Sequence, residues 1–211
     1  MTGSLVSPGT RERIRDLARP VALGLGRLGL TPNALTLIGF AIAVVAALAA
    51  ATGAWLAAGM LVIFGGVFDL FDGALARATG SASRLGAFMD SVFDRAGEAV
   101  VYVGIAAGMA AGGDPGGAVV AAAALAASQM VPYTRAKSEG LGFTPGTGMA
   151  AVGLAPREVR IVILTIGLVI APTAGLTALR VALGAIAILS TITTIQRIVH
   201  VIRQQLTQEQ G

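Results

Sequence analysis

Long apolar stretches interrupted by few charges are the feature that most restricts how this chain can fold. Several of these stretches approach or exceed the ~20 residues that an α-helix needs to cross the hydrocarbon core of a bilayer. Of the 211 residues, 55% are hydrophobic and 12% are charged, and the mean hydropathy is +0.80. A soluble domain of this size could not bury so much apolar surface. The sequence therefore predicts an integral membrane protein.

The apolar pattern predicts an all-α bundle of six transmembrane helices within one domain, residues 31–211. The expected spans lie near residues 34–54, 56–78, 86–111, 116–140, 158–172 and 175–200. Thr31 and Pro32 mark the start of the first span, because threonine is a good N-cap and proline fits the first helical turn.

Residues 1–30 are expected to form an N-terminal amphipathic helix in the headgroup region of the membrane. Arginines interrupt the segment, and no apolar core with a cleavage site follows, so it does not resemble a secretory signal. Apolar residues recur at helical spacing with the arginines off their stripe: Ile14, Leu17, Val21, Leu25 and Leu28. This pattern is typical of a helix lying in the membrane surface.

The distribution of basic residues predicts which ends of the spans face the cytoplasm. Basic residues occur in the N-terminal segment, in residues 77–84 and 135–160, and at Arg197 and Arg203. The connections near positions 53, 113 and 173 contain a single charge, Asp114. Since cytoplasmic connections are enriched in lysine and arginine, both termini are expected in the cytoplasm of a multi-pass cell-membrane protein.

The residue types that are scarce exclude several kinds of chemistry. The chain has no cysteine and one histidine, His200. Structural disulfides, thiolate metal sites, cysteine nucleophiles and histidine-rich zinc clusters are therefore excluded. His200 lies near the end of a span, where a residue at the membrane interface is expected rather than a catalyst. Membrane lipids are expected partners and nucleic acid is not, while homodimerisation stays open.

Four of the six aspartates fall within residues 69–94, between the second and third expected spans. Asp69 and Asp72 are three residues apart, and Asp90 and Asp94 are four apart, so each pair lies on one helix face. A short turn between the helices can bring the two faces together at the membrane surface.

Four neighbouring carboxylates repel one another unless they share protons or bind cations. Oxygen ligands of this kind suit Mg²⁺ or Mn²⁺, and two ions are expected. Two divalent ions beside a phosphate ester favour phosphoryl transfer. The competing interpretation is that the aspartates only form ion pairs with Arg77, Arg84 and Arg95.

The spacing of these residues resembles the signature of the CDP-alcohol phosphotransferase family. In this chain the pattern reads Asp69-x₂-Asp72-Gly73-x₂-Ala76-Arg77-x₈-Gly86-x₃-Asp90-x₃-Asp94. The resemblance extends over nearly the whole chain, including the six-span architecture. It implies attack by an alcohol hydroxyl on the β-phosphoryl group of CDP-diacylglycerol, with release of CMP.

The resemblance also implies roles for individual residues. Asp69, Asp72, Asp90 and Asp94 would bind metal, and Asp94 would in addition act as the general base. The residues expected to contact the CDP-lipid are Asn33, Thr36, Gly73, Ala76, Arg77 and Gly86. Some relatives have an aspartate at the position of Asn33, where an amide could still contact the nucleotide.

A group of cations outside the signature suggests a phosphorylated acceptor alcohol. The residues expected to bind the acceptor phosphate are Arg135, Lys137, Arg157, Arg160 and Arg197. They gather at the same membrane face as the aspartates and could make charge-assisted hydrogen bonds to a phosphate. Their pattern resembles the branch of the family that uses inositol phosphate to make phosphatidylinositol phosphate. Ordinary anchoring by positive charges is the simpler alternative.

Other functions remain as alternatives. Transfer to glycerol 3-phosphate or to a neutral alcohol is compatible with the signature. A cation transporter would instead carry carboxylates on several spans near the membrane midplane. A prenyl-diphosphate enzyme would be expected to have a larger chain and a lysine-rich pocket, whereas Lys137 is the only lysine. Glu98 could pair with Arg95 or with the acceptor cations.

The predicted topology can be tested by labelling introduced cysteines in this cysteine-free chain. Asp114→Cys should react with an impermeant thiol reagent added from outside the cell, because its connection lacks basic residues. Labelling from the cytoplasmic side only would contradict the topology and the shared location of the aspartates and the basic cluster.

Overall fold

The computed structural model describes residues 19–143 and 152–209, which are helical and contain no strand, as predicted. A helical stretch over residues 19–27 precedes six longer helices. These are α2 (Pro32–Ala51), α3 (Trp55–Ala78), α4 (Arg84–Ala111), α5 (Pro115–Gly140), α6 (Arg157–Ala174) and α7 (Leu176–Glu209).

Helices α2 to α6 agree closely with the first five expected spans, but α7 continues beyond the predicted end at residue 200 to Glu209. Thr31 caps α2 as predicted, its side chain accepting a hydrogen bond from the Ala34 N–H at 3.2 Å. Helices α2, α3, α5 and α7 are long and apolar enough to cross a membrane. Helix α6 carries three charges in 18 residues, so its length and composition alone do not mark it as a span.

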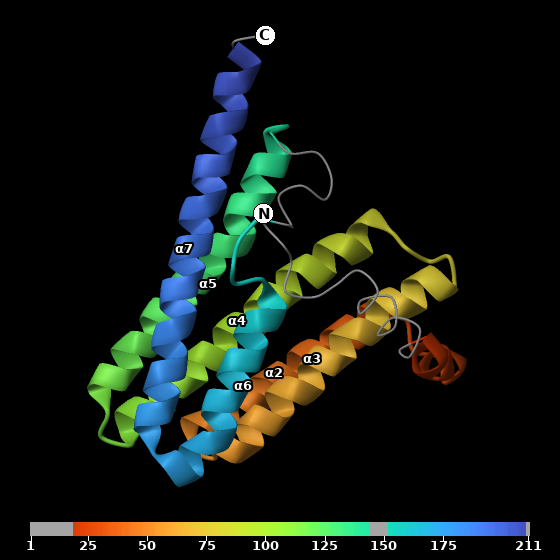
Figure 1. The fold of residues 1–211 in the computed structure, drawn as a ribbon. Coiled ribbons are helices and arrows are strands. Elements are labelled where there is room, and N and C mark those ends of the chain that lie inside the picture. Colours follow the sequence, from red (N-terminus) through yellow and green to blue (C-terminus); the bar gives the residue numbers. More distant parts are fainter. Residues whose placement is uncertain (1–18, 144–151, 210–211) are drawn as a thin grey trace.

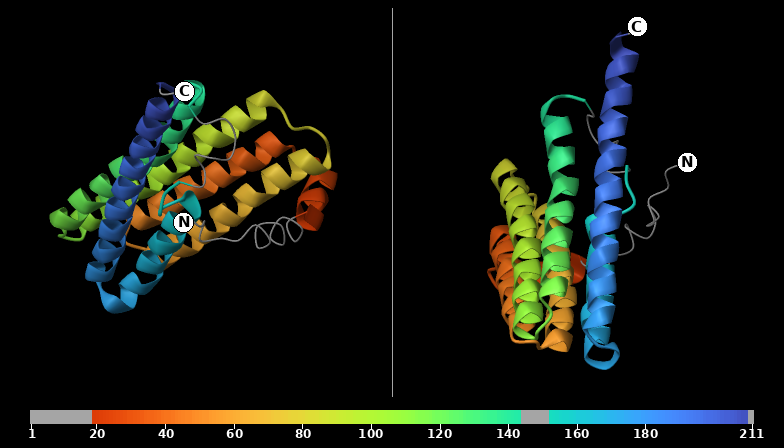
Figure 2. Two further views of the ribbon diagram at one scale, coloured as in Figure 1. Left: turned by 45° about the horizontal axis from the view of Figure 1, so that its top comes forward. Right: turned by 90° about the vertical axis from the view of Figure 1, so that its left-hand side faces the viewer.

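The helices run alternately in opposite directions through one bundle (Figure 1). The short connections after α2, α4 and α6 lie together at the lower end of the view. The turn between α3 and α4, the end of α5 and the start of α6 lie toward the other end. The last turns of α7 extend past the rest of the bundle (Figure 2). The connections poor in charge therefore share one end, and the aspartates lie toward the other.

Small residues allow α2 and α4 to pack with their backbones almost in contact. A Cβ atom at Gly104 would overlap the carbonyl oxygen of Ala47, and one at Gly108 would overlap that of Ala50. Close approach through small residues is a common way for membrane helices to associate, because lipid provides little hydrophobic driving force between them. Tyr102, on the same helix, is 1% exposed and contributes to the core.

An ion pair ties the connection before α5 to α7. The Asp114 side chain caps α5 through the Gly117 N–H at 2.8 Å and accepts a hydrogen bond from Arg180 Nε at 2.7 Å. The Arg180 hydrogen bond and the bond from Gly117 hold the pKa of the Asp114 carboxyl below its ordinary value. Because Asp114 is buried in this contact, the exposed Ala111 is the better position for the cysteine-labelling test.

The helical stretch at residues 19–27 packs against the ends of α2 and α3. Ala22 is fully buried in a cluster with Leu35 and Leu75, and Leu25 packs against that cluster. Val21, from the predicted apolar stripe, is 48% exposed. The first residues of the stripe, positions 14 and 17, lie outside the described residues. That this segment lies in the membrane interface stays a prediction.

The close contact between α2 and α4 leads to a stability prediction. Gly104→Ala should destabilise the protein by about 1–3 kcal/mol, the usual effect of overpacking, because its Cβ would push against the backbone of α2. Gly184→Ala is the matched control, since no atom lies within 4 Å of a Cβ at that helical position. Thermal unfolding in detergent checks both variants. Equal melting temperatures for the two would contradict the proposed packing constraint.

Candidate active site

The end of α3 and the first turns of α4 place the four predicted aspartates around one recess. Asp69, Asp72, Asp90 and Asp94 all line it, together with Gly73, Arg77 and Arg157 among others. Two capping contacts fix the turn that joins the helices. Thr79 Oγ1 donates to the Leu75 carbonyl at 2.8 Å, and Ser83 Oγ caps α4 by accepting from the Gly86 N–H at 3.0 Å. The convergence expected from the spacing is therefore present.

Neighbouring helices hold three of the carboxylates in defined orientations. Thr36 on α2 donates its hydroxyl proton to Asp72 Oδ2 at 2.8 Å, and both residues are 6% exposed. Arg157, at the start of α6, donates through Nη2 to Asp69 Oδ2 at 2.7 Å. Its Nη1 lies 2.9 Å from Asp94 Oδ2. One guanidinium thus bridges an aspartate of α3 and an aspartate of α4.

The donor set of the recess fits a hard divalent cation. The four aspartates contribute only oxygen ligands, which Mg²⁺ and Mn²⁺ prefer. Among residues 19–143 and 152–209, however, no three acidic or histidine side chains form a preassembled ligand cluster. Arg157 lies between two of the four carboxylates. Metal ligation by these aspartates therefore stays a prediction that their chemistry supports.

A second recess gathers the residues predicted to bind the CDP group. It is lined by all six of them, Asn33, Thr36, Gly73, Ala76, Arg77 and Gly86, and also by Asp72 and Asp90. Small residues keep it open, since a Cβ at Gly86 would lie 3.3 Å from Asn33 Oδ1. The recess therefore lies between the ends of α2, α3 and α4, next to the aspartates.

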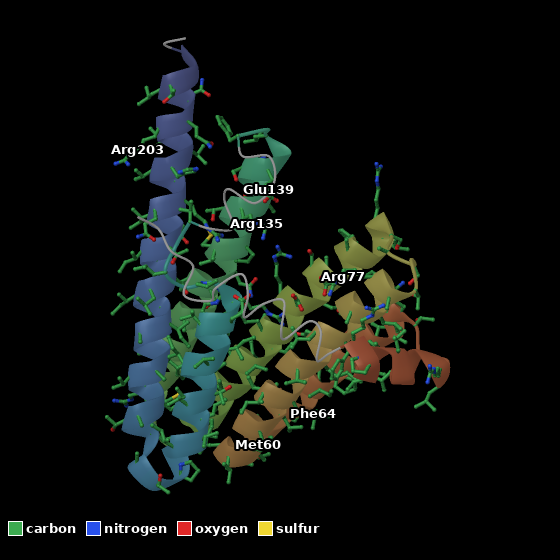
Figure 3. The ribbon with its side chains drawn as sticks, turned by 45° about the vertical axis from the view of Figure 1, so that its right-hand side comes forward. Met60, Phe64, Arg77, Arg135, Glu139 and Arg203 are labelled. Atoms are coloured by element: carbon green, nitrogen blue, oxygen red, sulfur yellow. The ribbon has the colours of Figure 1, made fainter. Side chains whose placement is uncertain are left out.

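A third recess on the α5–α6–α7 side of the aspartates gathers most of the predicted acceptor-binding cations. Arg135, Arg157, Arg160 and Arg197 line it, with Asp90 and Asp94 at its edge. Lys137 is exposed and is not among its lining residues. Figure 3 shows Arg135 and Glu139 on α5, where Arg135 Nε donates to Glu139 Oε1 at 2.8 Å.

Two of these arginines, Arg160 and Arg197, donate hydrogen bonds to other groups of the protein. Arg160 is 2% exposed and forms a two-pronged ion pair with Glu98, both N–O distances being 2.8 Å. Arg197 is 5% exposed and donates to the backbone carbonyls of Val131 and Val152. Part of their role is therefore to position other groups around the recess.

Glu98 and Thr193 are the residues of this region whose partners the sequence did not identify. Glu98 lies one turn after Asp94, so its spacing placed it near the site but left two possible partners open. The structure pairs it with Arg160 on α6. Thr193 bonds to the backbone just before α6. Thr193 lies in an apolar helix and belongs to no sequence motif, so the sequence did not indicate this contact.

Comparison with known proteins identifies the class. Residues 29–202 match the CDP-alcohol phosphatidyltransferase family, and the chain belongs to that family. The archaetidylinositol phosphate synthase of Pyrococcus horikoshii is 36% identical over 188 residues, which cover 89% of this chain and 92% of the relative. The phosphatidylinositol phosphate synthase of Mycolicibacterium smegmatis is 38% identical over 205 residues, covering 92% and 87% of the two chains.

Solved structures agree with this assignment. The crystal structure of Mycobacterium tuberculosis phosphatidylinositol phosphate synthase with CDP-DAG bound is similar, with a TM-score of 0.79 and 30% identity. The alignment covers 88% of this chain and 94% of that protein. The same enzyme in complex with manganese and citrate also has a TM-score of 0.79, at 31% identity, covering 87% and 88% of the chains. The present protein is thus an enzyme of phospholipid synthesis, and these relatives are named as archaetidylinositol phosphate or phosphatidylinositol phosphate synthases.

Proposed function

We propose that this protein transfers a phosphatidyl group from CDP-diacylglycerol to inositol phosphate, giving phosphatidylinositol phosphate and CMP. The observation that carries the proposal is the position of the aspartates. The predicted nucleotide recess lies on one side of them and the cationic recess on the other. Asp90 lines both recesses, so the two substrates would meet there.

The nucleotide side is suited to a CDP group. Gly73 and Ala76 leave the backbone of α3 accessible to a bulky ligand, and Arg77 lies beside Gly73. A planar guanidinium can donate two hydrogen bonds to a phosphate. Binding of CDP-DAG to a relative with 30% identity supports CDP-diacylglycerol as the lipid donor here.

A divalent cation would complete this site. We propose Mg²⁺ or Mn²⁺ at Asp69, Asp72, Asp90 and Asp94, with two ions as the expected number. A relative has been solved in complex with manganese, which supports the choice of cation. The cation would neutralise charge on the phosphate oxygens. Thr36 would keep the Asp72 carboxylate oriented toward it.

We further propose Asp94 as the general base for the acceptor hydroxyl. A hydroxyl is a poor nucleophile at neutral pH unless a nearby group accepts its proton. All four aspartates line the aspartate recess, but Asp94 also lines the cationic recess, whereas Asp72 also lines the nucleotide recess. Asp94 is thus placed on the side from which the acceptor would approach.

The cationic recess favours a phosphorylated acceptor over a neutral alcohol. Arg135 is exposed toward it, and Arg157 and Arg197 lie deeper. Charge-assisted hydrogen bonds from these three guanidinium groups would hold a phosphate monoester. Two relatives are named as synthases of archaetidylinositol phosphate and phosphatidylinositol phosphate, products that contain an inositol phosphate group, which supports inositol phosphate as the acceptor.

The fold also supports a proposed orientation in the membrane. Six spans, including α4 and α6, would place the aspartate end of the bundle at the cytoplasmic surface, where the basic residues gather. Residues 1–30 would lie in the interface beside it, and residues 31–211 would form the catalytic domain. Water-soluble inositol phosphate would then reach the site from the cytoplasm.

The acceptor is tested by CMP release from CDP-diacylglycerol with inositol phosphate, glycerol 3-phosphate and inositol compared in the same assay. Transfer should depend on inositol phosphate. Arg135→Ala should raise the acceptor KM about ten- to a hundredfold and leave the CDP-lipid KM unchanged, since one charged hydrogen bond contributes ~1.5–3 kcal/mol. Lys137→Ala, two residues away and outside the recess, is the matched control and should change less. Faster transfer to glycerol 3-phosphate would overturn the proposed acceptor.

The role of Asp94 is tested by Asp94→Asn, which keeps the shape but removes the proton acceptor. Turnover should fall at least ~100-fold, the usual contribution of a general base, while CDP-lipid binding persists. Mn²⁺ binding, measured by electron paramagnetic resonance, separates the two roles. Lost Mn²⁺ binding would make Asp94 primarily a ligand. Normal Mn²⁺ binding with turnover above about a tenth of wild type would show that Asp94 is not the base.

A further inference from the structure

The short segment that leads into α6 is fastened to α7 by one buried threonine. Thr193 is 0% exposed, and its Oγ1 accepts hydrogen bonds from the N–H groups of Leu154 at 3.0 Å and Ala155 at 2.9 Å. Both N–H groups lie outside a helix, so neither has a helical carbonyl as its partner. One side-chain oxygen therefore satisfies two consecutive backbone donors.

Two arginines hold the same segment from other directions. Arg197, one turn after Thr193 on α7, donates through Nε to the Val152 carbonyl at 3.0 Å. Arg160 donates through Nη1 to the Ala155 carbonyl at 2.9 Å, and Glu98 on α4 orients its guanidinium. Residues 152–155 are therefore connected by side chains to α4, α6 and α7.

A glycine lets the segment approach α7 this closely. Gly153 has φ of +122°, a conformation that residues with a side chain rarely adopt. A Cβ atom there would overlap Cγ2 of Thr193. The backbone conformation and the threonine contact thus require each other.

The position of this segment determines where Arg157 lies. Helix α6 begins at Arg157, two residues after Ala155, and Arg157 is the residue that bridges Asp69 and Asp94. Arg197, which lines the cationic recess, bonds to the same segment. A shift of residues 152–155 would therefore displace two cations of that recess.

We infer that Thr193 is a positioning residue that sets the acceptor side of the active site, by fixing the segment from which Arg157 projects. The inference rests on the proposed function, since it assigns the recess of Arg157 and Arg197 to the acceptor. The residues that line the nucleotide recess come from α2, α3, α4 and the turns that flank them. Thr193 does not line this recess. Loss of the threonine hydroxyl should thus affect one substrate and spare the other.

The test uses Thr193→Val, which keeps the branched shape but removes the oxygen that accepts from the Leu154 and Ala155 N–H groups. The KM for inositol phosphate should rise about tenfold, equivalent to ~1.4 kcal/mol, while the KM for CDP-diacylglycerol stays within about twofold. Thr193→Ser restores the oxygen and should recover the acceptor KM. Thr191→Val is the matched control, because Thr191 is exposed on the same helix and its hydroxyl donates to the Ala187 carbonyl of its own turn.

The outcomes separate positioning from general stability. If Thr193→Val raises the KM for both substrates equally, or if Thr193→Ser does not recover the acceptor KM, Thr193 has a merely structural role and the inference is overturned. If Thr193→Val does not fold, Gly153→Ala disturbs the same contact from the loop and is judged by the same ratio of KM changes.

Wild-type protein that transfers to no phosphorylated acceptor would overturn the proposed function. Normal wild-type transfer with an unchanged acceptor KM in Thr193→Val would overturn this inference alone.

Discussion

Repulsion among four carboxylates at one end of the bundle is the constraint on which the rest of the site depends. Two aspartates on α3 and two on α4 line one recess. Their charges are partly compensated by Arg157, which bridges Asp69 and Asp94, and by the hydroxyl of Thr36 on Asp72. Burying such charges without partners would cost several kcal/mol each. Helices α2, α3, α4 and α6 must therefore meet at this end, and that meeting creates the recesses on either side.

Two groups of helices in the bundle form the two recesses. Helices α2, α3 and α4 are held together by close contacts between small residues and form the nucleotide recess. Helices α5, α6 and α7 supply Arg135, Arg157, Arg160 and Arg197 to the other recess, and α4 contributes Arg95. One apolar core joins the two groups, and buried polar contacts also connect them, among which the Glu98–Arg160 pair joins α4 to α6. Polar contacts are directional, so they fix the relative position of the two recesses better than apolar packing would.

Much of the candidate site's geometry could be predicted from the sequence, because the four aspartates are close in the chain. The spacing of Asp69, Asp72, Asp90 and Asp94 on two consecutive helices restricts their directions before any tertiary contact forms. The six residues predicted to contact the nucleotide also line one recess, because the start of α2 lies beside the end of α3 and the start of α4. The residues that line the cationic recess were harder to predict from the sequence. Arg135 and Lys137 are two residues apart on one helix and point to different sides, a difference that net charge does not reveal.

Sequence by itself determined the all-helical membrane character, the bounds of most helices and the aspartate constellation, because hydrophobic runs and helical periodicity are local properties. Only the tertiary structure decided which partner each buried charge has. Glu98 pairs with Arg160 rather than with the adjacent Arg95, and Thr193 bonds to a segment 38 residues earlier in the chain. These contacts depend on how α4, α6 and α7 cross. Helix crossing is set by packing over whole surfaces, and no short stretch of sequence encodes it.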